Sequence, residues 1–177
     1  MPPSPLKLLP MLALLPLLAW IPVTLQAQAD PEPVPTSLSR DEFRVGITLG
    51  GTGFLGVVTE YRRGDWSAEV NLGTISFREI AVSLTGKRYF SDGSLRPAVG
   101  AGLWSLTAWT EDGSGSILIA RLPVAADWRF HGGHAAGLEV AFNRALAVNR
   151  LDPLDDTGPS DRIIPIPGAY YRYSPDR

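Results

Sequence analysis

The sequence contains no cysteine, which excludes disulfide bonds and thiolate chemistry. Neither sign of charge dominates, since the formal net charge is −2, and no basic patch suggests that the protein binds nucleic acid. After residue 42 the chain also lacks any apolar run long enough for a membrane-spanning helix. If that part enters a membrane, it must therefore do so as β-strands.

The first 29 residues are predicted to be a cleavable signal peptide. Lys7 precedes a leucine-rich stretch from Leu8 to Ile21, and Ala27-Gln28-Ala29 fits a small-x-small cleavage site. The alternative is a membrane anchor, but the stretch is shorter than the roughly 20 residues needed to span a bilayer, and prolines interrupt it. Residues 30–42 are proline-rich and are predicted to be an extended linker, more plausibly a spacer than a binding segment. The remaining length suits one domain.

Apolar and polar residues alternate in runs of roughly ten after residue 42. The clearest run is the segment 122–130, which a His131–His134 turn joins to a second run, 136–142. Alternation with period two places one set of side chains on each face of a strand. Here one face is bulky and apolar while the other carries charges and glycines, which is the pattern of a membrane barrel with lipid outside and a polar interior.

Eight such strands are predicted between residues 43 and 173, with residues 174–177 as a short polar tail. The eight ranges are Phe43–Gly50, Leu55–Arg62, Trp66–Gly73, Glu79–Phe90, Arg96–Trp109, Leu122–Phe130, Ala136–Phe142 and Ile163–Tyr173.

The connections alternate between two kinds. Three are tight-turn sequences, at residues 62–65, 91–94 and 131–134. The others tend to be longer or more irregular, at residues 50–54, 74–78, 110–115 and 144–161. This alternation indicates an up-and-down meander with two different ends. In outer-membrane barrels the short turns face the periplasm and the long loops face outward. The loop Arg144–Asp161 is our first expectation for partner contact, since function often lies in such loops.

Aromatic residues cluster near the predicted strand ends, where an amphipathic ring would meet the lipid headgroups. The alternative is ordinary core packing in a soluble barrel. The residues concerned are Phe43, Phe54, Tyr61, Trp66, Tyr89, Phe90, Trp109, Trp128, Phe130, Tyr170, Tyr171 and Tyr173.

Two segments carry a family resemblance. Arg96-Pro97-Ala98-Val99-Gly100-Ala101-Gly102-Leu103 and the closing Gly168-Ala169-Tyr170-Tyr171-Arg172-Tyr173 are similar to strands of small eight-stranded bacterial outer-membrane barrels of the OmpA/OmpX type. The resemblance covers residues 43–173 and implies an all-β, antiparallel, up-and-down transmembrane barrel. One departure is that Ser-Pro-Asp-Arg follows Tyr173, whereas such chains usually end on an aromatic residue that the assembly machinery reads.

The inward face of this barrel is predicted to collect charges of both signs. Because a small barrel is just wide enough for its side chains to fill it, these charges must pair. The favoured interpretation is a structural plug of salt bridges, and the alternative is a narrow gated pore. The residues are Arg44, Glu60, Arg62, Glu69, Lys87, Arg121, Asp127, Arg129, Glu139 and Arg172.

No catalytic, cofactor or metal site is predicted. His131 and His134 share one tight turn without nearby ligand partners, so a solvated turn is favoured over a metal site. The acidic segment Asp152–Asp156 lacks the spaced ligands and central glycine of a calcium loop. A lipid A deacylase would need a nucleophile beside a base, and the seventh strand carries no His-x-Ser.

The sequence therefore favours a monomeric, non-enzymatic outer-membrane barrel of the cell envelope, porin-like in shape, with a structural or surface-interacting role. Its expected partners are the lipid bilayer and the outer-membrane insertion machinery. The first alternative is a secreted lipocalin-like barrel that holds a small apolar ligand, and the second is a lipid A-modifying enzyme. The first alternative requires the bulky face to point inward.

Overall fold

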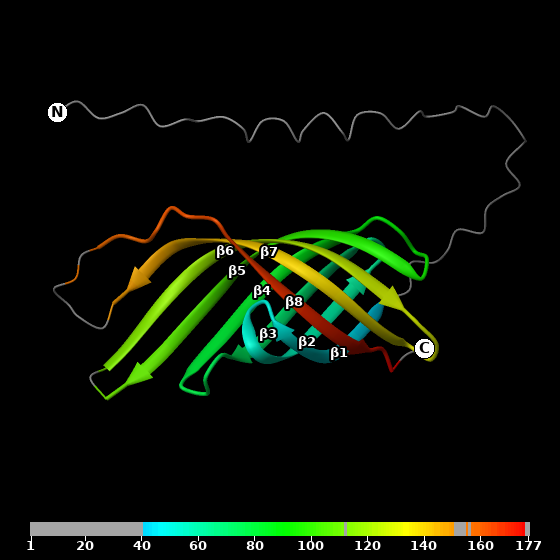
Figure 1. Ribbon diagram of the computed structural model, residues 1–177. Coiled ribbons are helices and arrows are strands. Elements are labelled where there is room, and N and C mark those ends of the chain that lie inside the picture. The colour runs from blue at the N-terminus through cyan, green and yellow to red at the C-terminus, as the bar shows by residue number, and fades with distance from the viewer. Residues whose placement is uncertain (1–40, 112, 151–154, 156, 176–177) are drawn as a thin grey trace, which may run out of the picture. The chain divides into compact units, whose positions relative to one another are not determined.

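Eight antiparallel strands form a closed barrel in the computed structural model, which describes residues 41–111, 113–150, 155 and 157–175. The strands are β1 (Glu42–Gly50), β2 (Gly53–Arg63), β3 (Trp66–Thr74), β4 (Glu79–Tyr89), β5 (Leu95–Thr110), β6 (Gly113–Arg129), β7 (His134–Asn149) and β8 (Ile164–Tyr173). Each pairs with the next along the chain, and β8 pairs with β1 (Figure 1). The predicted all-β, eight-stranded up-and-down barrel is thus confirmed.

The predicted signal peptide and all but two residues of the predicted linker lie outside the described residues. Glu42 was assigned to that linker, but it is the first residue of β1. Ser174 was assigned to the polar tail, but its backbone N–H donates to the Gly133 carbonyl (2.9 Å) and its side chain is buried. The described part of the chain contains no helix long and apolar enough to cross a membrane.

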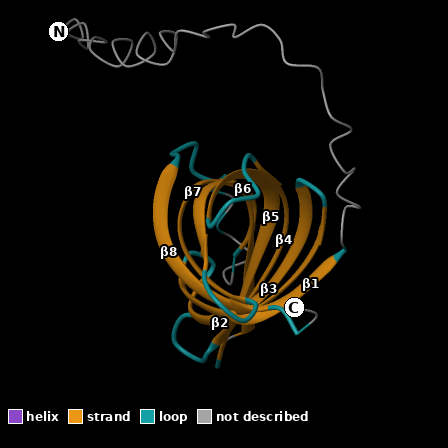
Figure 2. Ribbon diagram, turned by 90° about the vertical axis from the view of Figure 1, so that its right-hand side faces the viewer, coloured by secondary structure: helices purple, strands orange, loops and turns teal. Residues whose placement is uncertain are grey.

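The two ends of the barrel differ, as Figures 1 and 2 show. At one end, which we call the turn end, lie the short β2–β3, β4–β5 and β6–β7 connections, the start of β1 and the finish of β8. At the other, the loop end, lie the remaining four connections. The β1–β2 connection is a tight turn, because Gly50 and Gly51 both adopt positive φ angles (73° and 71°) that glycine tolerates.

Strands β5, β6 and β7 are longer than the others and project beyond them at the loop end (Figure 1). Two expectations were wrong here. The sixth strand begins at Gly113 instead of Leu122, and the seventh runs through residues 144–149, which were assigned to a loop. The ladder pairs Thr110 with Gly113 and Ser116 with Asn149. A register shift opposite Leu118 and Ile119, where β7 carries the extra residue Leu146, breaks the alternation that would have revealed the extension of β7.

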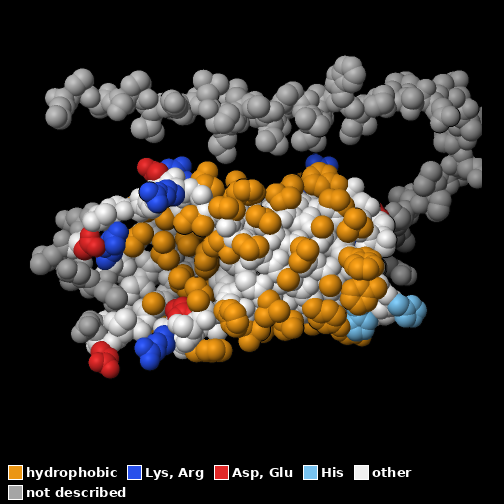
Figure 3. Space-filling view, in the orientation of Figure 1, with side chains coloured by type: hydrophobic (Ala, Val, Ile, Leu, Met, Phe, Trp, Pro, Cys, Tyr) orange, Lys and Arg blue, Asp and Glu red, His pale blue; other side chains and the backbone are white. Residues whose placement is uncertain are grey.

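Bulky apolar side chains lie on the outside of the barrel, and most buried polar or charged side chains lie inside. Along β4, for example, Ile80, Val82 and Leu84 are 52, 41 and 61 % exposed, while Lys87 is only 1 % exposed. Figure 3 shows hydrophobic side chains over the visible wall, with acidic and basic ones gathered mainly at the loop end. The strand alternation thus reverses the usual arrangement of a soluble protein, because the polar groups lie inside the barrel and the apolar ones outside.

Candidate functional site: the charged interior

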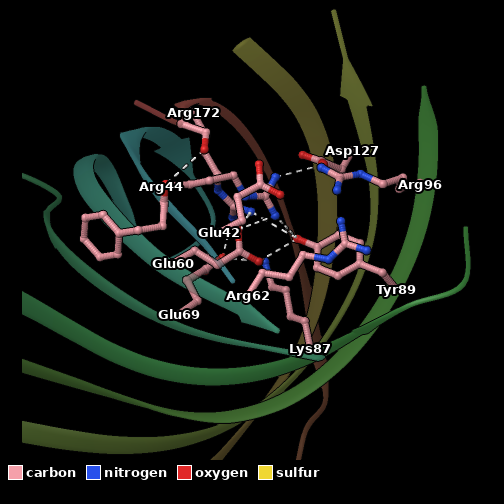
Figure 4. A network of polar contacts seen from close by, with 12 residues as sticks. Glu42, Arg44, Glu60, Arg62, Glu69, Lys87, Tyr89, Arg96, Asp127 and Arg172 are labelled. Carbon is pink, nitrogen blue, oxygen red and sulfur yellow. Dashed lines mark hydrogen bonds and ion pairs between the residues drawn. The ribbon is translucent and has the colours of Figure 1, made fainter. Parts of the chain in front are cut away.

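The interior of the turn-end half is filled by a network of buried ionic side chains (Figure 4). All ten charged positions predicted to face inward lie inside the barrel. Nine of these residues are less than 9 % exposed, and the Arg129 side chain is 16 % exposed. Since successive residues of a strand point to opposite faces, each of these residues is placed by its strand's alternation.

Glu60 on β2 lies at the centre of the network. Its carboxylate is 2.6 Å from Arg44 Nη2 and 2.7 Å from Arg172 Nη1. The hydroxyl of Tyr89 donates to the same carboxylate across 2.7 Å. Three donors from three other strands therefore satisfy one buried carboxylate, and this offsets the large cost of removing the charge from water.

Arg44 also reaches across the lumen from β1 to β6. Its Nη1 donates to Asp127 Oδ2 at 3.0 Å, and Arg96 on β5 donates to the same oxygen. Because β1 and β6 are not neighbours in the barrel, this pair bridges the interior and does not lie along the wall.

Lys87 on β4 connects a second set of acids. Its Nζ lies 2.9 Å from Glu69 Oε2 and 2.7 Å from Glu139 Oε2. Arg172 also pairs with Glu69, and Arg121 pairs with Glu139. These shared partners join the two sets of acids into one continuous network. Arg96 of β5 joins this network through Asp127, so all eight strands contribute residues to it.

At the turn end two further ion pairs lie next to the network. Arg62 Nη2 is 2.7 Å from Asp92, a residue of the exposed β4–β5 turn, and Arg62 Nε donates to the Gly64 carbonyl at 2.7 Å. Arg129 lies 3.7 Å from Glu42. These contacts tie two of the short turns and the start of β1 to the ionic network.

Four network residues were missed in the sequence. Arg96 shares its strand face with Gly100 and Gly102, and Glu42 lies one residue before the predicted first strand. Tyr89 and Tyr170 were assigned to the outer aromatic belt, which was wrong, because they are 1 % and 7 % exposed inside the barrel. Their parity with Lys87 and Arg172 was the signal that could have placed them correctly.

Tyr170 packs against the network inside the barrel. Its ring lies 3.8 Å from the Arg172 guanidinium carbon and 5.4 Å from Lys87 Nζ, in cation–π contact with both. It packs over Gly137, where an added Cβ would lie 2.2 Å from the tyrosine ring. The cavity left beside it measures about 10 Å³, which is room for about one water molecule.

The interior changes character towards the loop end. There Ala81, Trp104 and Ile119 form a buried apolar cluster, with Leu106, Ile117 and Ile166 packed against it. The charged inward side chains therefore gather near the turn end, while this apolar cluster, which we call the apolar zone, lies nearer the loop end beside buried uncharged residues such as Ser83 and Asn143.

The two histidines lie at the turn end. His134 Nδ1 is 2.5 Å from the Tyr171 hydroxyl, and its ring stacks on those of Phe130 and Tyr171. Within the described ranges, no three His, Asp or Glu side chains are grouped as metal ligands. A nucleophile–base pair of the kind a deacylase needs would require a hydroxyl beside a histidine, and the hydroxyl that His134 contacts belongs to a tyrosine of the aromatic cluster.

Most of the acidic segment Asp152–Asp156 lies outside the described residues. Asp155 is described, and its Oδ2 pairs with Arg150 Nη1 at 3.2 Å. Its other oxygen accepts a hydrogen bond from the Thr157 backbone N–H at 3.0 Å. Hydrogen bonds from Thr157 hold the pKa of Asp155 below its usual value, so the carboxylate is stabilised by its own loop.

No protein-family model, curated protein or solved structure matches this chain. The geometry of the barrel is therefore the basis for its proposed function.

Proposed function

We propose that the protein is a non-enzymatic outer-membrane β-barrel with a structural or surface-interacting role, its interior filled by paired charges. The observation that carries this proposal is the reversed sidedness of the barrel. Among the residues that the structure describes, thirty-four large hydrophobic side chains are exposed, whereas the ionic network is buried. In water such a surface would be unfavourable, but in a bilayer each of those side chains lies in its preferred solvent.

The distribution of outward charges supports the same proposal. Among the described strand residues, only Arg63, Arg88 and Arg144 are charged and exposed. Arg63 is the last residue of β2, and Arg88 is the penultimate residue of β4, so both lie at the turn end. Arg144 lies just beyond the level where β8 begins its ladder with β7. The wall between these levels is free of exposed charge, as contact with acyl chains requires.

The turn end also carries the aromatic ring system that a membrane interface favours. Trp128 and Phe130 meet edge to face at 6.3 Å, and His134 lies 4.9 Å from the Tyr173 ring. Nearby, the guanidinium of Arg88 lies over Trp66 at 5.6 Å. Rings with one polar edge, and arginines that reach past them, are typical of the headgroup level.

The filled interior argues for a structural role instead of transport. Arg44, Asp127 and Tyr89 occupy the lumen, and the remaining cavity there holds about one water molecule. Binding to partners is then left to the loop end. The predicted signal peptide, the insertion machinery and the monomeric state belong to the same proposal.

The soluble alternative is less well supported. A lipocalin-like barrel needs bulky apolar side chains pointing inward around a ligand, but along β1 Phe43, Ile47 and Leu49 are 44, 50 and 52 % exposed while Arg44 is buried. Its interior would also have to be open at the level of Glu60, where four buried side chains meet.

The test is to express the full-length chain and compare unheated and boiled membrane fractions on a detergent gel. A folded barrel that resists alkaline extraction and migrates differently before boiling is the expected result. Protein recovered in the soluble fraction, with no heat-dependent shift, would contradict the proposal. Protein that is membrane-bound but extracted by alkali would indicate a peripheral association and would contradict it as well.

A further inference from the structure

An open, solvent-facing cavity of about 390 Å³ lies at the loop end, among the projecting parts of β5, β6 and β7. Four apolar side chains form much of its lining, and we call them the floor: Leu106, Ala108, Ile117 and Val148. Asn149 and Arg150 line its polar edge, which we call the rim. A volume of this size falls within the usual range for pockets that bind small molecules.

The floor belongs to the apolar zone of the interior. Leu106 and Ile117 line the cavity and also pack against the buried cluster that includes Trp104, which is 5 % exposed. Ile166 reaches the same cluster from β8. A polar interior is the norm for a membrane barrel, so inward apolar side chains gathered at its mouth favour an apolar occupant.

The barrel wall is lower beside this zone. The β1–β8 ladder ends at the pair Gly50 and Gly168, so residues 164–167 of β8 extend past the β1–β2 turn without a ladder partner on that side. The Gly51 N–H reaches this edge and donates to the Pro167 carbonyl at 3.0 Å. Pro165 and Pro167 have their missing N–H groups on this same side, as expected where no strand follows.

The rim supplies polar groups that can contact the polar end of a bound molecule. Arg150 is held in place by Asp155 at 3.2 Å and by the Thr157 carbonyl, to which its Nε donates at 3.0 Å. Its side chain is 34 % exposed, so it stays accessible at the cavity edge. An apolar floor next to a polar rim matches a molecule that has a hydrocarbon chain and a polar head.

We propose that this cavity binds a single-chain amphiphile of the fatty-acid type, with its chain on the floor and its head at the rim. The inference rests on the proposed function, because a bilayer around the barrel is what would supply such an amphiphile. The ionic network stops the chain from passing further, so the site binds an amphiphile and does not conduct it.

The experiment uses Trp104 as a reporter and 12-bromododecanoic acid as the probe, because bromine quenches tryptophan fluorescence on close contact. The other four tryptophans of the full chain are changed to phenylalanine, and the barrel is inserted into phospholipid vesicles. We expect saturable quenching of Trp104. Ala108→Phe fills the floor and should abolish the saturable part, while Ala101→Phe, which places the same ring on the outer face of β5, should leave it unchanged.

A second reporter separates the two proposals. In a chain whose five tryptophans are all phenylalanine, Leu84→Trp places the fluorophore on the outer wall, where the native side chain is 61 % exposed. Quenching at position 84 without saturable quenching of Trp104 would overturn the cavity proposal and leave the membrane barrel intact. So would quenching of Trp104 that is insensitive to Ala108→Phe. Absence of quenching at both positions would overturn the membrane barrel and the site with it.

Discussion

Arg44 on β1 and Asp127 on β6 meet across the lumen, with 3.0 Å between Nη1 and Oδ2, although 83 positions separate them in the chain. Neither side chain is more than 1 % exposed. The pair therefore depends on closure of the barrel, since only the closed sheet brings β1 opposite β6. The pair also depends on its neighbours, because Arg44 forms a second ion pair with Glu60 and Asp127 forms a second one with Arg96.

Removing Arg44 should be strongly destabilising. Arg44→Ala leaves Glu60 with fewer donors and Asp127 with only Arg96, and breaking a buried ion pair on one side costs about 3–5 kcal/mol. The loss is expected in the free energy of unfolding, measured by urea titration of the barrel in vesicles. Arg144→Ala is the matched control, because its pair with Asp161 (2.6 Å) is exposed and such pairs contribute at most about 1 kcal/mol. Equal losses from the two variants would show that the interior pairs do not hold the barrel together.

An arginine on the outer wall should be costly only near the middle of the membrane. Leu84 is the central residue of β4 and points outward, so Leu84→Arg should cost about 2–4 kcal/mol in vesicles. Leu95→Arg, at the first residue of β5, should cost only about 0–1 kcal/mol because position 95 lies near the interface. Unfolding titrations of both variants measure the difference. If both cost the same in vesicles, the wall does not face a hydrocarbon layer.

The plugged interior should not pass small sugars. Arg44, Tyr89 and Arg172 meet Glu60 in the lumen, and only about 10 Å³ of free space remains beside Tyr170. Vesicles that contain the barrel should therefore show no swelling in an isotonic arabinose solution, whereas vesicles with a general porin swell at once. Swelling at a rate proportional to the amount of barrel would mean that the network opens, and the narrow-pore interpretation would replace the plug.

Much of the architecture could be predicted because a strand's faces repeat every two residues. Along β4, the alternation alone separates Ile80, Val82 and Leu84 from Ser83 and Lys87, and the structure places these two sets on opposite faces. The tight-turn sequences gave the order of the hairpins in the same way. Closure of the barrel followed because eight strands of this kind leave no edge when they form a ring.

Pairing across the lumen could not be predicted from this pattern. The alternation says that Arg44 and Asp127 point inward, but which residues meet depends on strand tilt and register, and no local pattern encodes these. The length of β6 was missed for a different reason. Ser114, Gly115 and Ser116 carry little apolar signal, yet their backbone groups still pair with β5. Residues 110–115 were therefore assigned to a loop, and the sixth strand was predicted to begin only at Leu122.

Close approach of two backbones makes Gly46 the most sensitive glycine of β1. A Cβ at this position would lie 1.9 Å from the Tyr171 carbonyl oxygen on β8, and backbone atoms on that side cannot swing away. Gly46→Ala should thus strain the β1–β8 seam that closes the barrel, at a cost of about 1–3 kcal/mol in the free energy of unfolding. Gly86→Ala is the control, since its Cβ would have no neighbour nearer than 3.9 Å. That variant should be neutral or more stable by about 0.4–1 kcal/mol, because alanine restricts the unfolded chain. Urea titrations of the two variants measure both effects, and a Gly46→Ala barrel as stable as the parent would mean that the β1–β8 seam is looser than this geometry requires.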